Sequence, residues 1–340
     1  MTAGDARRPG RPRVSYSVVI PTIGRRCLTD CLEALAAAAV PAPYEVFLVD
    51  DRPAADGPLD TVGAGPLTDR LRLLATHGRG PAAARNAGLR EVTTPWVVFL
   101  DDDVRVGADW GSRLADDLAA ADPVTVGVQG RLTVPLPADR EPTDWERCTA
   151  GLQDAAWATA DMAYRTQALR KAGGFDERFR RAFREDADLA LRMMDAGWKL
   201  TRGSRSTLHP VRPADRMVSV RAQRGNADDA LMGHLHGADW WGRAAAPRGR
   251  LPRHLAVTVA GLAAAGLILG GRPRAAAVAA GVWALGTAEF AWARIAPGPR
   301  TAPEVVTMIG TSVVIPPLAV RHWAVGRVRH RGTAPWGVGP

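Results

Sequence analysis

The sequence predicts an α/β protein with a mostly parallel central sheet, helices on both faces, and additional hydrophobic helices in its C-terminal part. Three observations support this fold class. Short apolar runs alternate with helical patterns over the first half of the chain, as in sheets built from parallel strands. Two of these runs end directly in clusters of aspartate. After about residue 250, three long stretches carry almost no charge.

The first strand is predicted at Tyr16–Pro21, an apolar run that ends in a Pro-Thr-Ile-Gly turn. A helix follows over Arg26–Val40, where apolar side chains recur at helical spacing. A second buried strand is predicted at Glu45–Val49, before two carboxylates, and a third at Leu71–Ala75. Gly80–Glu91 is predicted to be a helix because its proline stands in the first turn.

The fourth strand, Trp96–Leu100, runs into three consecutive aspartates, Asp101, Asp102 and Asp103. Adjacent like charges raise one another's pKa unless a cation lies between them. A hard divalent cation such as Mg²⁺ or Mn²⁺ meets this need, because it prefers oxygen ligands. Open α/β sheets also bind ligands at the carboxyl ends of their strands. The alternative is an acidic turn that caps the next helix.

The elements beyond the fourth strand carry weaker patterns. A strand pair is predicted within Val124–Val134 and a polar helix at Glu185–Ala196. Leu200–His209 is predicted to be a strand or a loop, and Arg212–Gly237 a polar helical stretch. These elements extend the predicted α/β domain to about residue 240.

The length of 340 residues allows two domains, or one domain with an appendage. Residues 1–13 are rich in Arg, Pro and Gly and lack the apolar core of a signal peptide, so they are predicted to be a disordered leader. The α/β domain is predicted at 14–240 and the hydrophobic helices at 251–322. A basic tail with Gly and Pro is predicted at 323–340.

The hydrophobic stretches are Leu255–Gly271, Ala275–Ala293 and Val305–Val320. Each has about 16–19 residues, close to the lower limit for crossing a hydrocarbon core of roughly 30 Å. Their Ala and Gly content suits close helix packing in lipid. The alternative is a soluble helical appendage, but three charge-poor stretches in succession favour membrane association. Pro316–Pro317 makes the third stretch a poorer span.

The orientation in a membrane is open from the sequence. Four arginines between residues 243 and 253 precede the first stretch and place the α/β domain on the cytoplasmic side by the positive-inside rule. Arg272 and Arg274 follow the first stretch, however, and four further arginines lie between residues 321 and 331. Two crossings with a surface-lying third segment would place this last cluster inside, but not Arg272 and Arg274.

The net charge of +9 favours anionic partners such as phosphates or a membrane surface. No segment has the pattern of a nucleic-acid-binding module, so no nucleic-acid partner is predicted. The three cysteines, Cys27, Cys31 and Cys148, cannot form a disulfide framework, which is consistent with a reducing compartment.

Six segments of the chain, in this order and at these spacings, resemble family 2 glycosyltransferases with the GT-A fold. They are VVIPTIGR (18–25), VDD (49–51), GPAAARNAGL (80–89), FLDDDV (99–104), GGFDERF (173–179) and REDADLALRMMDAGW (184–198). Each motif is weak alone, but the set is specific and covers about residues 16–236. The resemblance implies a Rossmann-like GT-A catalytic domain at 14–240 that binds a nucleotide diphosphate sugar and uses Mg²⁺ or Mn²⁺.

The resemblance assigns nucleoside contacts to the ends of the first two strands. Asp50, with Asp51 beside it, takes the role of contacting the nucleobase, since a carboxylate accepts hydrogen bonds from base or ribose donors. Pro21 and Thr22 match the loop that lies along the nucleoside. The family's usual Gly-Ser turn after the acidic pair is replaced here by Arg-Pro, which leaves the base open.

The resemblance places the diphosphate and the metal at two further motifs. Arg85 and Asn86 match the family's Arg-Asn pair, and Arg85 can bind a phosphate or a carboxylate in bidentate fashion. The alternative for Arg85 is a structural tie to the acidic clusters. In the DxD signature Asp101 faces the ribose or donor sugar, Asp103 binds the metal, and Asp102 between them contributes to donor binding.

The resemblance also assigns the acceptor side. Asp186 matches the general base of inverting members, with Glu185 as the second candidate. The alternative is a solvated acidic helix face. His209 is where many GT-A enzymes have a histidine at the metal or diphosphate, so it joins Asp101 and Asp103 in the predicted metal site. Trp157 and Asp161 are assigned to the acceptor or sugar pocket.

The expected function is metal-dependent inverting transfer of a sugar from a nucleotide diphosphate sugar to an acceptor hydroxyl. A membrane-associated enzyme with its catalytic domain on the cytoplasmic side suggests a lipid-linked or envelope glycan as acceptor. Two alternatives stay open from the sequence. One is a nucleotidyltransferase of the same fold, which would consume nucleoside triphosphates without needing Asp186. The other is a membrane-tethered protein that binds a nucleotide sugar or glycan with an inactive site.

Overall fold

The computed structural model describes residues 14–336, and the predicted leader at 1–13 lies outside the described residues. The described chain forms two compact units. One comprises residues up to 133 and 157–210, and the other comprises 134–156 and the residues from 211 onward. The polar helical stretch before residue 240 therefore groups with the hydrophobic helices.

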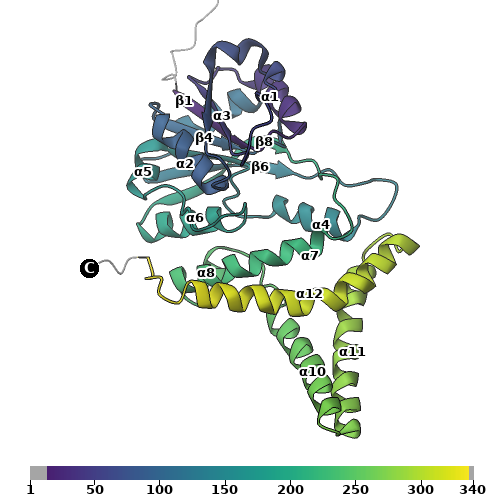
Figure 1. Ribbon diagram of the computed structural model, residues 1–340. Coiled ribbons are helices and arrows are strands. Elements are labelled where there is room, and N and C mark those ends of the chain that lie inside the picture. The colour runs from purple at the N-terminus through teal and green to yellow at the C-terminus, as the bar shows by residue number, and fades with distance from the viewer. Residues whose placement is uncertain (1–13, 337–340) are drawn as a thin grey trace, which may run out of the picture. The chain divides into compact units, whose positions relative to one another are not determined.

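The first unit is built on one eight-stranded sheet in the order β3-β2-β1-β4-β7-β6-β8-β5 (Figure 1). Strands β3, β2, β1 and β4 are parallel neighbours, whereas β7 runs antiparallel to β4 and β6, and β5 runs antiparallel to β8. The strands are β1 (Tyr16–Thr22), β2 (Val46–Asp50), β3 (Leu71–Ala75), β4 (Trp96–Leu100), β5 (Arg105–Val106), β6 (Thr125–Thr133), β7 (Asp161–Arg165) and β8 (Lys199–Leu208). The predicted α/β sheet is confirmed, and it is mixed beyond β4.

The predicted strand pair within Val124–Val134 is wrong, because this segment is the single strand β6. Its glycines allow close approach and do not form a turn. A Cβ atom built on Gly130 would lie 2.2 Å from Oδ2 of Asp161, and one built on Gly127 would lie 2.5 Å from Cδ2 of Leu200. The two glycines thus let β6 pass between β7 and β8.

Six helices belong to this unit: α1 (Cys27–Ala38), the 3-10 helix η1 (Val62–Arg70), α2 (Pro81–Glu91), α3 (Trp110–Ala120), α5 (Thr166–Lys171) and α6 (Glu185–Asp195). Helix α2 lies very close to β1, since a Cβ atom on Gly88 would be 2.5 Å from Cγ1 of Val19. In the core beneath, Phe99 of β4 meets Phe175 edge to face, with ring centroids 5.1 Å apart. This packing fixes α2 against the carboxyl half of the sheet.

The second unit is helical. Its elements are α4 (Asp144–Ala150), η2 (Gly151–Gln153), α7 (Val218–Ala222), η3 (Gln223–Gly225), α8 (Asn226–His236), α9 (Trp240–Arg243), α10 (Leu251–Leu269), α11 (Pro273–Ile295) and α12 (Ala302–Arg329). Helices α10, α11 and α12 are each long and apolar enough to cross a membrane. Helix α12 continues past the predicted limit at residue 322, so part of the predicted tail is helical.

Helices α10 and α11 form a hairpin that packs through small residues (Figure 1). A Cβ atom on Gly261 would lie 2.9 Å from Cδ1 of Trp283, and one on Gly286 would lie 2.5 Å from Cγ2 of Val257. Close backbone approach of this kind is typical of helices that associate in lipid.

Candidate functional site

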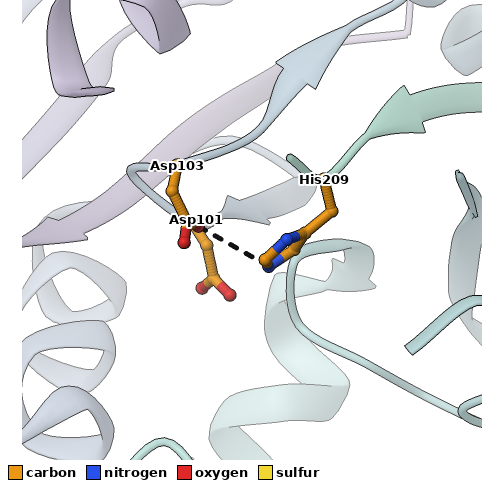
Figure 2. Close-up of side chains that lie close together, drawn as sticks. All are labelled: Asp101, Asp103 and His209. Carbon is orange, nitrogen blue, oxygen red and sulfur yellow. Dashed lines mark ion pairs between the residues drawn. The ribbon is translucent and has the colours of Figure 1, made fainter. Parts of the chain in front are cut away.

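Two aspartates and a histidine converge at the carboxyl edge of the sheet (Figure 2). Asp101 and Asp103 follow β4, and His209 follows β8, where its backbone N–H donates to the carbonyl of Thr133 at 2.8 Å. One ligand atom from each of the three side chains lies within 4.8 Å of the others. Nε2 of His209 is 3.6 Å from Oδ1 of Asp103. This donor set fits Mn²⁺ or Mg²⁺, which prefer carboxylate oxygen, and imidazole is a common additional ligand.

The middle aspartate of the triad faces the turn after β1. Asp102 is buried, and its two oxygens accept from the hydroxyl of Thr22 at 2.7 Å and from Nη1 of Arg25 at 2.8 Å. Thr22 in turn accepts from the backbone N–H of Gly24 at 3.0 Å. The geometry therefore gives Asp102 and Thr22 a structural role, which orders the turn beneath the metal site.

Arg85 of α2 joins the two acidic motifs. Its guanidinium donates to Oδ1 of Asp101 at 2.8 Å and to Oε1 of Glu185 at 2.7 Å. The Arg85 side chain is almost fully buried and lies over the ring of Phe175. The structural tie that the sequence left as an alternative for Arg85 is present, and it links the predicted metal site to the predicted base.

The carboxyl pair at the start of α6 has raised pKa values. Burial raises the pKa of Glu185 to about 7, although Arg85 opposes the shift. Burial also raises the pKa of Asp186. Oε2 of Glu185 is buried and has no hydrogen-bond partner among the residues the structure describes. Asp186 is only partly buried, so it is the more accessible of the two for a substrate hydroxyl.

Asn86, next to Arg85, holds the loop before α6. Its side chain donates to the carbonyl of Phe175 at 2.8 Å and to Glu177 at 3.1 Å, and accepts from the N–H of Phe175 at 2.9 Å. Gly174 lies against it with φ +70, and an added Cβ would meet the amide oxygen of Asn86 at 2.6 Å. Asn86 therefore positions the GGFDERF loop.

The two aspartates at the end of β2 accept hydrogen bonds from two different loops. Asp51 is buried and accepts from the hydroxyl of Thr76 at 2.7 Å and from the N–H groups of Arg79 and Gly80 at 2.8 and 2.9 Å. Asp50 forms a fork with Arg52, whose Nη2 lies 2.6 Å from Oδ2, and this hydrogen bond lowers the pKa of Asp50. Pro21 of β1 pairs with Val49 of β2 and is partly exposed.

The two residues assigned to the sugar pocket differ. Asp161 is fully buried within the sheet, where the fold engages it, and its assignment to the sugar pocket stays a prediction. Trp157 is partly buried and has φ 66, a left-handed conformation that is strained for a bulky residue. Its backbone N–H donates to Oε1 of the buried Gln129 at 2.6 Å. Such strain is characteristic of functional positions.

Arg25 and Gln129 were not identified from the sequence. Arg25 belongs to the VVIPTIGR segment, and only its closeness to a strand end marks it. Gln129 lies inside a strand without any motif. Both act by fixing a neighbour, Asp102 or Trp157, and such long-range pairings leave no local pattern.

Comparison with known proteins identifies the family of the chain. The family model described as "Glycosyl transferase family 2" matches residues 17–187. Two curated proteins named "Pre-mycofactocin glycosyltransferase", from two strains of Mycobacterium tuberculosis, are each 30% identical over an alignment of 217 residues that covers 58% of this chain. The chain spans 43% of the length of these relatives.

Among solved structures, the mannosyltransferase PcManGT from Pyrobaculum calidifontis, in complex with GDP-Man and Mn²⁺, is similar at a TM-score of 0.53 and 19% identity. The similarity covers 93% of this chain and 88% of that one, and it establishes the fold alone. The predicted GT-A type of α/β fold with C-terminal apolar helices is therefore confirmed. By the match over half of its length, the chain belongs to glycosyl transferase family 2.

Proposed function

We propose that this protein transfers a sugar, with inversion, from a nucleotide diphosphate sugar to an acceptor hydroxyl in a metal-dependent reaction. One observation carries the proposal: Arg85 donates both to Asp101 of the acidic metal-type site and to Glu185 of the carboxyl pair at the start of α6, and so links the two. A donor-binding protein without activity would have no need for the carboxyl pair.

The metal site would hold the diphosphate of the donor. Asp101, Asp103 and His209 would be the ligands of Mn²⁺ or Mg²⁺, which would neutralise charge on the departing nucleoside diphosphate. The imidazole favours Mn²⁺, since Mg²⁺ is bound mainly through carboxylates, phosphates and water. Pro21, Asp50 and Arg52, at the ends of β1 and β2, would flank the nucleoside.

Asp186 would accept the proton of the acceptor hydroxyl. The acceptor oxygen would then form a bond to the anomeric carbon while the bond from that carbon to the diphosphate oxygen breaks. The nucleoside diphosphate leaves with the bonding pair, and attack from the opposite face inverts the anomeric configuration. Glu185 would be a positioning residue, since Arg85 holds one of its oxygens.

Membrane association of α10 and α11 would place the catalytic domain on the cytoplasmic side, because arginines precede α10. An acceptor at a membrane surface would be a lipid-linked or envelope glycan. The two curated relatives carry pre-mycofactocin in their name, so this compound is a second acceptor to include in any assay.

The proposal is tested by incubating the purified full-length protein with a panel of nucleotide sugars. We expect release of nucleoside diphosphate that requires Mn²⁺ or Mg²⁺ and stops with EDTA. Release that persists in EDTA would contradict the metal site. Release of pyrophosphate from a nucleoside triphosphate would support nucleotidyl transfer instead.

A further inference from the structure

Helix α12 meets the α10–α11 hairpin near one end of the hairpin only. Ile315 packs with Phe290, and Pro316 lines a cavity of about 520 Å³ together with His254 and Gly286. Figure 1 shows α12 bending here and crossing the hairpin at the end away from its tip. The tip half of the hairpin is exposed instead, with Leu269 90% accessible. A third span packed beside the hairpin would cover that half.

The crossing point is polar. Arg294 of α11 is buried there and donates to Thr311 at 2.7 Å and to Ser312 at 3.1 Å of α12. It also donates to Asp144 at 2.8 Å and to Ser219 at 3.0 Å. Arg250 pairs with Glu289 at the same end of the hairpin. Ionised groups this dense belong at the level of the lipid headgroups.

Helix α12 also packs on polar helices of the same unit. Gly326 is buried against α8, where a Cβ atom would lie 2.7 Å from Cα of Ala227. Leu318 packs against the cluster that contains Val220 of α7. Helices α7 and α8 carry several charged residues, among them Asp228 and Arg221, and cannot lie in hydrocarbon.

The exposed face of α12 carries large apolar side chains on both sides of Pro316–Pro317, with a gap between Val314 and Val325. Its exposed large side chains are Val306, Ile309, Val313, Val314, Val325 and Val328. The spacing of these residues follows the helical repeat, so they form one stripe. Exposed Arg321 lies on this face in the gap between Val314 and Val325, and exposed Arg327 and Arg329 border its C-terminal part. An apolar stripe bordered by arginine is characteristic of a helix that lies in the plane of an anionic membrane surface.

We propose that α12 lies flat on the cytoplasmic surface of an anionic lipid bilayer and that only the α10–α11 hairpin crosses it. The stripe would enter the acyl boundary, and the arginines would meet lipid phosphates. Two crossings return the chain to its starting side, so the arginine cluster after residue 320 obeys the positive-inside rule. Arg272 and Arg274, at the hairpin tip, would reach the far headgroups by extending their long side chains.

This inference rests on the proposed membrane association and is tested by depth measurement. Spin labels are placed singly at Val306, Val313 and Val328, and as a reference at Leu262 of α10. The background replaces Cys27, Cys31 and Cys148 by Ser, and the full-length protein is reconstituted in bilayers that contain phosphatidylglycerol. We expect equal, shallow depths for the three α12 labels and a deep position for Leu262.

A spanning α12 would give a different result, because residues 306 and 328 are about 33 Å apart along a helix and would lie at opposite surfaces. Depths that pass through the bilayer centre would overturn the inference. A shallow or aqueous Leu262 would instead contradict membrane crossing by the hairpin itself.

A second measurement does not depend on the cysteine-free background. A fluorescent reporter that matures only in the cytoplasm is fused after residue 340 of the wild-type chain. We expect fluorescence, with the catalytic domain protected from external protease in intact cells. A dark fusion that is cleaved from outside would show an odd number of crossings. As a charge control, Arg321→Gln with Arg327→Gln should weaken binding to phosphatidylglycerol vesicles more than Arg131→Gln does.

Discussion

Two groups of carboxylates in the first unit differ in how many of their hydrogen-bond acceptor positions are filled by the protein. Asp161, in the middle of the sheet, accepts from Nε1 of Trp110 at 2.9 Å, Nε of Arg205 at 2.8 Å and the hydroxyl of Thr207 at 2.6 Å. It is fully buried. Every strong acceptor position of this group is used by the fold, so it has little capacity left for a ligand.

The centre at the sheet edge is only partly satisfied. Asp101 accepts from Arg85 and keeps 28% of its side chain exposed, and Glu185 has a buried oxygen without a partner in the described part of the chain. Asp101, Asp103 and His209 also turn toward one another, although a pair of carboxylates repels. The difference teaches that spare acceptor capacity, more than acidity, distinguishes the candidate site from a structural carboxylate.

The largest effect is expected from Asp103→Asn. The substitution removes a negative ligand from the metal site while keeping its shape, and we expect turnover to fall about 10⁴-fold, since a metal supplies several kcal/mol to charge stabilisation. Donor hydrolysis at saturating Mn²⁺ measures it. Asp109→Asn, in the exposed loop that follows, is the matched control and should keep wild-type turnover. Normal activity of Asp103→Asn would remove Asp103 from the site.

Asp186→Asn separates the base from the metal site. We expect transfer to an acceptor to fall about 10³-fold, as for loss of a general base, with donor affinity unchanged. The KM for donor and the kcat for transfer are measured separately. Asp195→Asn, at the other end of α6, is the control. If Asp186→Asn raised KM with kcat intact, Asp186 would be a binding residue.

Arg85→Lys tests whether the two halves of the site are coupled. Lysine cannot hold two carboxylates with one planar fork, so both Asp101 and Glu185 lose their fixed geometry. We expect activity to fall about 10–100-fold, as for other residues that orient metal ligands, with a higher Mn²⁺ requirement. Arg90→Lys, exposed on the same helix, should change neither quantity. An unaltered Mn²⁺ requirement would argue against coupling.

The pH dependence follows from the direction of the pKa shifts. Burial raises the pKa of Glu185 to about 7 and also raises that of Asp186. A general base works only when deprotonated, so the raised pKa of Asp186 should make activity fall, as the pH is lowered, at a higher pH than an ordinary aspartate would, by up to tenfold per unit. The kcat/KM profile between about pH 5 and 8 measures it. A profile that is flat down to about pH 5 would place the base elsewhere.

The fold was largely predictable because β1, β2 and β4 are buried apolar runs and the helices between them follow helical spacing. The segments at Leu71–Ala75 and Gly80–Glu91 differ from β3 and α2 by at most one residue. The sequence misled at β6, where two glycines permit contact with Asp161 and Leu200. In a sequence, a glycine that forms a turn cannot be told from a glycine that lets a neighbouring segment pack closely. Only the position of that neighbouring segment distinguishes the two cases.

The site was predictable only in part. Residue type and order located Asp101, Asp103 and His209, which the structure brings together. Residue type and order could not show that Asp102 faces a different partner from Asp101 and Asp103. The direction of the Asp102 side chain depends on Thr22 and Arg25, which come from a distant segment. The burial of Asp161 could not be predicted for the same reason. Its partners lie 44 to 51 positions away in the sequence.

The smallest effect on turnover is expected from Asp161→Asn, which changes the carboxylate whose acceptor positions are all filled by the fold. The substitution leaves the charge of Arg205 with its longer contact to Asp117 at 3.3 Å, and we expect the free energy of unfolding to fall by about 3 kcal/mol. This should appear as a melting temperature lower by several degrees. The kcat of the folded protein at low temperature should stay within about twofold of wild type. A large loss of kcat with unchanged stability would instead make Asp161 part of the functional centre and break the contrast between the two carboxylate centres.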